Sequence, residues 1–238
     1  MNTLEAIESR HSVRDYTDER LSDAACAALQ REIDLCNEEG HLHMQLVVDE
    51  PQAFTSGRAR YGSFSGVRNY VAVVGEHTSD LQERAGYYGE RLVLAAQKMG
   101  LNTCWVALTF KRVPDAFSVD SGEKLVCLIT VGHGTTSGEP HRIKTAPEVS
   151  NWTTASPDWF KAGVTAALLA PTAMNQQRFT LTREGTVVTA KAGVGFYTKL
   201  DLGIVKYNFE IAAGRENFRW ASDIARPKNA SRYTEVKA

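Results

Sequence analysis

Two guanidinium groups and a hydroxyl near the N-terminus are spaced in a way that suits a phosphate group. The segment Arg10-His11-Ser12-Val13-Arg14 places Ser12 between two arginines. If this segment is extended, Arg10, Ser12 and Arg14 point to the same side, because side chains alternate along an extended chain. Guanidiniums bind phosphate oxygens through bidentate, charge-assisted hydrogen bonds. The alternative is a solvated basic stretch with ordinary surface ion pairs, and the spacing alone favours that alternative.

A second basic segment, Arg142-Ile143-Lys144, repeats the alternation of cations in a Gly-, Pro- and His-rich stretch. Two cations on one side of an extended segment suit the same anionic ligand. By itself, however, the segment is more simply interpreted as a charged loop.

A third polar segment, residues 170–177, has the sequence Ala-Pro-Thr-Ala-Met-Asn-Gln-Gln. Thr172, Asn175 and Gln177 offer donors and acceptors that could recognise an imide or amide edge. The alternative is a connecting loop whose polar side chains bind their own backbone. A fourth segment, residues 100–108, begins with Gly and is typical of a core strand, whose end could also offer a backbone N–H to a ligand.

The sequence lacks the short motifs of several other common functional sites. The chain contains no GxSxG, no Walker loop and no GxGxxG. Of the six histidines only His41 and His43 are close, without a neighbouring carboxylate, so we predict surface residues and no metal site. The four cysteines form no CxxC pair and no zinc-like spacing with histidine, and we expect buried, reduced thiols.

Composition limits the classes of protein further. The 238 residues fit one large or two small domains, and 27 basic against 28 acidic residues argue against non-specific nucleic-acid binding. No apolar run approaches the roughly 18 residues of a membrane span. The first ten residues show no secretory signal, so we expect a cytoplasmic protein.

Helical and strand patterns alternate along the chain, which predicts an α+β or α/β class. Asn2 or Thr3 is the predicted cap of a first helix. Ser22 is the predicted cap of a second helix, which Gly40 ends. The predicted helices are an opening one and residues 22–36, 79–99, 157–170 and 200–213; the predicted strands are 44–48, 70–74, 102–108, 124–131, 178–183 and 186–191. We expect a long loop at 53–69, a crossing connection at 132–156, a hairpin at Glu184-Gly185, and a polar arm from Arg226.

Residues 87–100 and 201–214 resemble each other. Both are predicted helices with Gly at the third and fourteenth positions, and Trp105 and Trp220 follow the closing glycines by five or six residues. An internal duplication and chance agreement are about equally good explanations of this similarity.

Taken in order, the segments resemble the nitroreductase family of FMN-dependent oxidoreductases. SRHSVRDYTDERLS is similar to that family's R-x-S-x-R phosphate segment, and GERLVLAAQKMGLNTCW to its central helix and following strand. LVCLITVGHG and RIKTAPEV resemble its closing strand and basic segment, and APTAMNQQRFTL resembles its A-P-S-x-x-N-x-Q-P-W motif. That last motif lies in the second half here, an order that resembles a divergent group with an internal duplication.

The resemblance implies a nitroreductase-like α+β fold, with a mixed, mainly antiparallel sheet flanked by helices. It also implies FMN as the cofactor, with a role for each matching segment. The phosphate and ribityl chain would be held by Arg10, His11, Ser12 and Arg14, with Arg142 and Lys144 closing on the phosphate. The isoalloxazine would meet Pro171, Thr172, Ala173, Asn175 and Gln177, the backbone of Val106, Ala107 and Leu108 near N5, and Asn69 as a further pocket residue.

The activity implied is that of an FMN-dependent NAD(P)H oxidoreductase. Hydride would pass to flavin N5, and electrons would leave to a nitroaromatic or quinone on the same face, in a ping-pong cycle that needs no catalytic side chain. A flavin-binding protein for storage or sensing is one alternative, and flavin-dependent reductive dehalogenation or oxidation is another. We expect two halves, 1–150 with the phosphate segment and 151–238 with the flavin-facing motif, folded as a pseudo-dimeric monomer, with a homodimer as the alternative.

Overall fold

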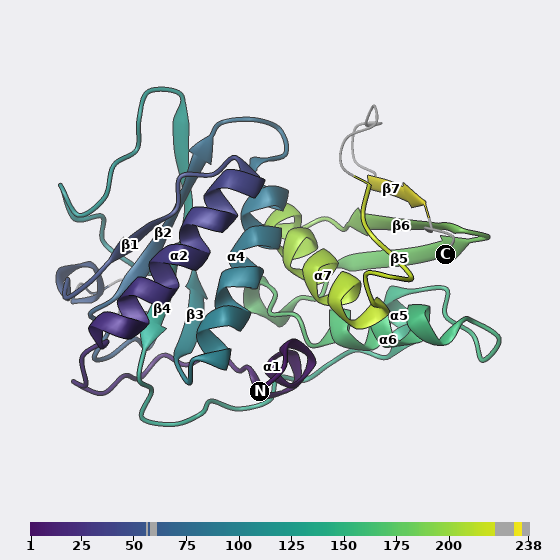
Figure 1. The fold of residues 1–238 in the computed structure, drawn as a ribbon, viewed down its shortest axis with the longest axis horizontal. Coiled ribbons are helices and arrows are strands. Elements are labelled where there is room, and N and C mark those ends of the chain that lie inside the picture. Colours follow the sequence, from purple (N-terminus) through teal and green to yellow (C-terminus); the bar gives the residue numbers. More distant parts are fainter. Residues whose placement is uncertain (56, 58–60, 222–230, 235–238) are drawn as a thin grey trace. The chain divides into compact units, whose positions relative to one another are not determined.

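The computed structural model describes residues 1–55, 57, 61–221 and 231–234. Its internal contacts divide the chain into two compact units, Met1–Pro140 and His141–Ala238. Figure 1 shows the elements of each unit along the chain. The division places Arg10, Ser12 and Arg14 in the first unit, and Arg142 and Lys144 in the second.

A four-stranded antiparallel sheet forms the centre of the first unit. Its strands are β1 (Gln45–Val47), β2 (Tyr70–Glu76), β3 (Asn102–Val106) and β4 (Glu123–Gly132), in the order β1-β2-β4-β3. The two central strands carry the apolar runs that predicted buried strands, and all of β2 except Glu76 is buried. In register, Tyr70 pairs with Thr130 and Trp105 with Ile129.

In its described part, this unit has the helices α1 (Thr3–Ser9), α2 (Asp23–Gly40) and α4 (Leu81–Lys98). α2 and α4 pack on each other and cover one face of the sheet (Figure 1). The predicted caps are confirmed: Asn2 accepts the N–H of Glu5, and Ser22 accepts the N–H of Ala25. α4 approaches β3 closely at Gly89, where a Cβ would overlap the ring of Trp105.

Loops cover the other face of the sheet. Tyr70, Ala72 and Val74, which alternate along β2, share an apolar cluster with Phe54 and Phe64 of the preceding loop. A short 3-10 helix, η1 (Gln52–Phe54), begins that loop. The predicted loop at 53–69 therefore contributes to the core, while its residues 56 and 58–60 lie outside the described part of the chain.

The second unit combines helices with a smaller antiparallel sheet. Helices α6 (Asp158–Leu168) and α7 (Thr198–Ala213) pack on each other, and α7 packs on strand β6. The sheet has the order β5-β6-β7, with β5 (Phe179–Glu184), β6 (Val187–Ala192) and β7 (Ser231–Thr234). The described part of the unit also contains two short elements, α5 (Ala146–Val149) and η2 (Ala173–Asn175). Its core contains an aromatic cluster made by Trp159, Phe160, Phe209, Phe218 and Trp220.

These elements confirm the predicted α+β class, with small differences. The hairpin turn is Gly185-Thr186, one residue later than predicted, and Gly185 supplies its positive φ of 59°. The prediction of an arm is wrong for residues 231–234, because Ser231–Thr234 pairs with the edge of β6. Residues 226–230 and 235–238 of that arm lie outside the described residues.

Within the described part of the chain, no helix has the length and apolar character needed to span a membrane.

Candidate functional site

The first candidate segment leaves α1 in an extended conformation, as predicted. Arg10 caps the helix with φ −74° and ψ 120°. Ser12 then forms a parallel bridge with Thr103 of β3, and the N–H of Val13 donates to the carbonyl of Thr103 at 3.0 Å. The end of a short helix and the edge of a sheet therefore fix this backbone from both sides.

Arg10 is buried, with its side chain only 2% exposed. Its nearest anionic group is Glu90 of α4, at 4.0 Å from Nε to Oε1, which is too long for a hydrogen bond. Among the described residues, none accepts a hydrogen bond from this guanidinium. Because a buried guanidinium carries five N–H donors, this one retains the capacity to bind an anion.

The other two groups of the segment lie nearer the surface. Arg14 is exposed, and its guanidinium stacks over the ring of Phe64 with 5.9 Å to the centroid. Ser12 is half-buried, and its side chain lowers the pKa of the Cys104 thiol against the larger effect of burial, which raises it. His11 is half-buried as well.

The second unit brings the basic segment and the 170–177 loop together. The backbone N–H of Lys144 donates to Oε1 of Gln177 at 2.9 Å, and Lys144 Nζ donates to the carbonyl of Gln177 at 2.9 Å. The carbonyl of Arg142 accepts bonds from Asn175 Nδ2 and Gln177 Nε2, each at 2.8 Å. The side chains of Asn175 and Gln177 therefore brace the basic segment, while the guanidinium of Arg142 is left at the surface.

The 170–177 loop has an unusual backbone. Met174, Asn175 and Gln177 have φ values of 53°, 52° and 45°. Asn tolerates this left-handed region, whereas Met and Gln rarely adopt it, at a cost of about 1 kcal/mol or more each. Such a conformation persists only where its surroundings hold it. Pro171, Thr172 and Ala173 are half-buried, and Met174 is 91% exposed.

The remaining predicted site residues lie at the end of β3 and just before β2. β3 ends at Val106, two residues earlier than predicted, so Ala107 and Leu108 lie beyond the ladder and Leu108 is exposed. Asn69 is buried, and its Oδ1 accepts the N–H of Asp49 at 3.0 Å, which makes it a brace between two loops.

Among the described residues, sequence reasoning missed three buried acids: Glu90, Asp201, and Glu210, which pairs with Arg215 at 3.2 Å. Glu90 Oε2 accepts the indole N–H of Trp105 at 3.3 Å, and its Oε1 faces Arg10. Asp201 is 2% exposed, and burial raises its pKa to about 6, against hydrogen bonds from Ala173 and Gln176 that lower it. The available signal for Glu90 and Asp201 was an acid in a largely apolar helical stretch that holds one other charged residue, Arg91 in GERLVLAA and Lys199 in KLDLGIV.

The prediction that His43 lacks a carboxylate neighbour is wrong. Its Nδ1 lies 2.9 Å from Oε2 of Glu123, because the start of β4 and the residues before β1 meet at one end of the sheet. Burial opposes ionisation of Glu123, but the bonds from His43 and from the N–H of Asp120 prevail and lower its pKa. His43, Asp120 and Glu123 have ligand atoms within 4.8 Å of one another.

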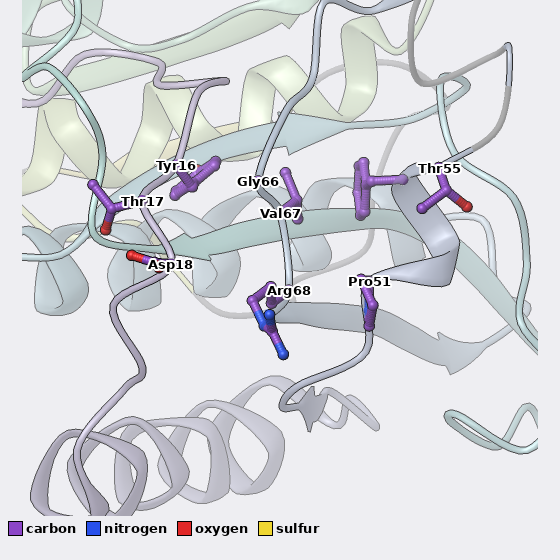
Figure 2. A pocket seen from close by; sticks show the side chains of 9 residues that line it. Tyr16, Thr17, Asp18, Pro51, Thr55, Gly66, Val67 and Arg68 are labelled. Carbon is purple, nitrogen blue, oxygen red and sulfur yellow. The ribbon is translucent and has the colours of Figure 1, made fainter.

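A pocket of about 280 Å³ opens elsewhere in the first unit, and its side chains are shown in Figure 2. Tyr16, Phe54 and Val67 provide its apolar wall, and Arg68 is its cation. The guanidinium of Arg68 is already bound to Asp49, with 2.8 Å from Nε to Oδ1. The charge of this pocket is therefore compensated, and none of Arg10, Ser12 or Arg14 lines it.

Known proteins share this architecture. The crystal structure of a "putative nitroreductase" from Thermotoga maritima matches with a TM-score of 0.68 at 20% identity, covering 98% of this chain and 94% of that one. A nitroreductase-like protein from Exiguobacterium sibiricum, solved in complex with FMN, matches with a TM-score of 0.52 at 14% identity, covering 64% of this chain and 98% of that one. These likenesses define the class as the nitroreductase fold.

The family follows from the sequence. The model described as "Putative TM nitroreductase" matches residues 2–213, nearly the whole chain. The chain belongs to this family. No curated protein sequence matches it.

Proposed function

We propose that this chain binds FMN and transfers electrons from NAD(P)H to a small acceptor such as a nitroaromatic or a quinone. Membership of the nitroreductase family and the FMN complex of a protein with the same fold support the proposal. The observation that carries it is the buried guanidinium of Arg10, which among the described residues lacks a hydrogen-bond acceptor. An anionic ligand would supply the hydrogen-bond acceptors that the ion pair with Glu90, at 4.0 Å, does not supply.

The residues present fit the phosphate end of FMN. Arg10 would supply buried donors, Ser12 a neutral donor and Arg14 an exposed cation, in a segment whose backbone is fixed by β3. Arg142 and Lys144 would add charge from the basic segment that Gln177 braces. A phosphate dianion is matched by several such cations, and each charge-assisted hydrogen bond contributes about 1.5–3 kcal/mol.

The ring end would use the 170–177 loop. Thr172 Oγ1 accepts the N–H of Gln177, and Asn175 Nδ2 donates to the carbonyl of Arg142. The hydroxyl proton of Thr172 and the second amide proton of Asn175 would remain for the polar edge of an isoalloxazine. β3 ends where the backbone N–H groups of Ala107 and Leu108 leave the ladder. Bound FMN would supply the redox chemistry, accepting hydride at N5 and returning electrons to the acceptor. The side chains would bind and orient it, so no acid or base from the protein is required.

The proposal is tested with the purified protein. We expect a yellow protein whose visible absorbance is bleached by NADH or NADPH without oxygen and returns when a nitroaromatic or quinone is added. Initial rates should give parallel double-reciprocal lines, because donor and acceptor would use one flavin face in turn. Bound flavin that no nicotinamide reduces would favour a storage or sensing protein, and intersecting lines would contradict the shared face.

A further inference from the structure

Asp201 is buried, and none of the described residues forms an ion pair with it. It lies in the first turn of α7 and is 2% exposed. Burial is the largest influence on its pKa, and the opposing influences are two hydrogen bonds rather than a neighbouring charge. Burying a carboxylate this way is costly unless its oxygens are well bonded, so the partners of this acid indicate what it does.

Both partners of Asp201 belong to the 170–177 loop. Oδ1 accepts the backbone N–H of Ala173 at 2.9 Å, and Oδ2 accepts Nε2 of Gln176 at 2.8 Å. The two donors flank Met174 and Asn175, which are the first two of the three residues in this loop with a left-handed backbone. Asp201 is therefore bonded across the strained part of the loop rather than acting as a cap of its own helix.

Gln176 extends the connection to a second loop. Its Nε2 also donates to the carbonyl of Phe196 at 2.6 Å, next to Tyr197, whose φ of 56° precedes α7. One carboxylate thus holds, directly or through Gln176, two loops that present Met174 (91% exposed) and Phe196 (74% exposed) to solvent.

We propose that Asp201 is the positioning residue of this site, fixing the 170–177 loop in the conformation that presents Thr172 and Asn175 to the flavin. The identity of the ligand as a flavin rests on the proposed function. The role of Asp201 in fixing the loop rests on the geometry of its hydrogen bonds alone. Asp201 itself need not touch the cofactor. Its Oδ1 satisfies the backbone N–H of Ala173, and its Oδ2 holds the side-chain amide of Gln176. These bonds add to the backbone bonds that the loop makes itself, from Asn175 to Thr172 and from Gln176 to Ala173.

The test uses Asp201→Asn in the full chain, because the amide retains the shape but cannot accept both bonds. With alanine nitrogens labelled, amide exchange reports Ala173, and the amide of Ala190, buried in β6, is the internal reference. We expect the protection of Ala173 to fall about tenfold or more while Ala190 is unchanged. In the same variant the dissociation constant of FMN should rise about tenfold, with an altered flavin absorption band.

Asp158→Asn is the matched control, because Asp158 is a first-turn acid of α6 whose side chain is fully exposed. It should change neither the protection of Ala173 nor the affinity for FMN.

If Asp201→Asn does not fold, Gln176→Met is the second variant. It keeps the Asp201–Ala173 bond and removes the bonds from Gln176 to Asp201 and Phe196, and weaker FMN binding is again expected. Wild-type protection of Ala173 in Asp201→Asn, or unchanged FMN binding in whichever variant folds, would overturn the positioning role. Failure of the wild-type protein to bind FMN would instead refute the proposed function and leave the exchange result standing.

Discussion

Single residues carry most of the chemical information in this chain. The guanidinium of Arg10 lies inside the first unit at 4.0 Å from Glu90, close enough for attraction but too far for a hydrogen bond. At this distance the charge of Glu90 offsets part of the free-energy cost of burying the Arg10 cation, while the N–H donors of Arg10 stay available. If Glu90 lay within hydrogen-bond distance, it would occupy N–H donors of Arg10 and leave fewer of them for a ligand.

Asp201 also makes stability depend on pH. Its folded pKa is raised to about 6 from an ordinary 3.8, so the folded chain binds a proton more readily than the unfolded chain between these values. The contribution of Asp201 is therefore fully present below about pH 4 and is lost as pH rises through 6.

We expect the free energy of unfolding of the wild type, relative to Asp201→Asn, to fall by about 1–3 kcal/mol between pH 4 and pH 7. Urea unfolding of both proteins at several pH values measures this difference, and pH effects shared by the two chains cancel. A difference that is constant with pH, or that grows with rising pH, would contradict the assigned environment of Asp201.

Elements show where local sequence rules are sufficient. Ser22 begins α2 and accepts the N–H of Ala25 at 3.1 Å, as its residue type predicted. Ser22→Ala should lower the free energy of unfolding by about 1 kcal/mol, because an N–H of the first turn loses its acceptor. Thermal or urea unfolding measures it. Ser79→Ala, at an exposed serine just before α4, is the control and should change stability by less than about 0.5 kcal/mol.

Gly89 shows the opposite case, in which packing overrides helix propensity. Ala is the better helix former by about 1 kcal/mol, but its Cβ would overlap the ring of Trp105. Gly89→Ala should therefore destabilise the protein by about 1–3 kcal/mol. The double variant with Trp105→Phe should lose less than the sum of the single changes, and strict additivity would show that the ring is not the obstacle.

Most elements could be predicted from the sequence because their signals are local. Gly100 and Gly214 close α4 and α7 with φ of 79° and 82°, as a glycine after a helix suggests. α5 was missed because four residues carry no periodicity, and β7 because its strand depends on the open edge of β6. Glu90 and Asp201 were missed because charged residues are expected at the surface, and their partners come from distant segments.

At the scale of the whole molecule, residue types and spacing singled out the site segments, but only their resemblance to a family implied a role for each. The sequence did place Arg142 and Gln177 among the candidates, but not the bonds that join them, which depend on the folded second unit. The roles of Arg10, Ser12, Arg14 and Asn69 toward a flavin remain predictions, and so does the duplication suggested by Gly89 and Gly203.

The oligomeric state is a prediction from the order of the motifs. Because the phosphate segment occurs once and the 170–177 motif once, we expect one chain to bind one FMN as a monomer. Light scattering of the dilute, flavin-loaded protein should give 26.2 kDa, the mass of one chain. A flavin-loaded species of twice that mass that loses FMN on dissociation would favour a homodimer.

The most direct measurement of the central claim compares FMN with riboflavin, which lacks only the phosphate. Fluorescence titration should show that Arg10→Ala combined with Arg142→Ala weakens FMN binding by about a hundredfold or more, with riboflavin affinity changed by less than about twofold. Arg14→Ala, at an exposed position, should act in the same direction without disturbing the core, whereas Arg20→Ala, an exposed arginine paired with Asp49, should have no effect. Equal loss of affinity for both flavins would contradict the phosphate-binding role of these arginines.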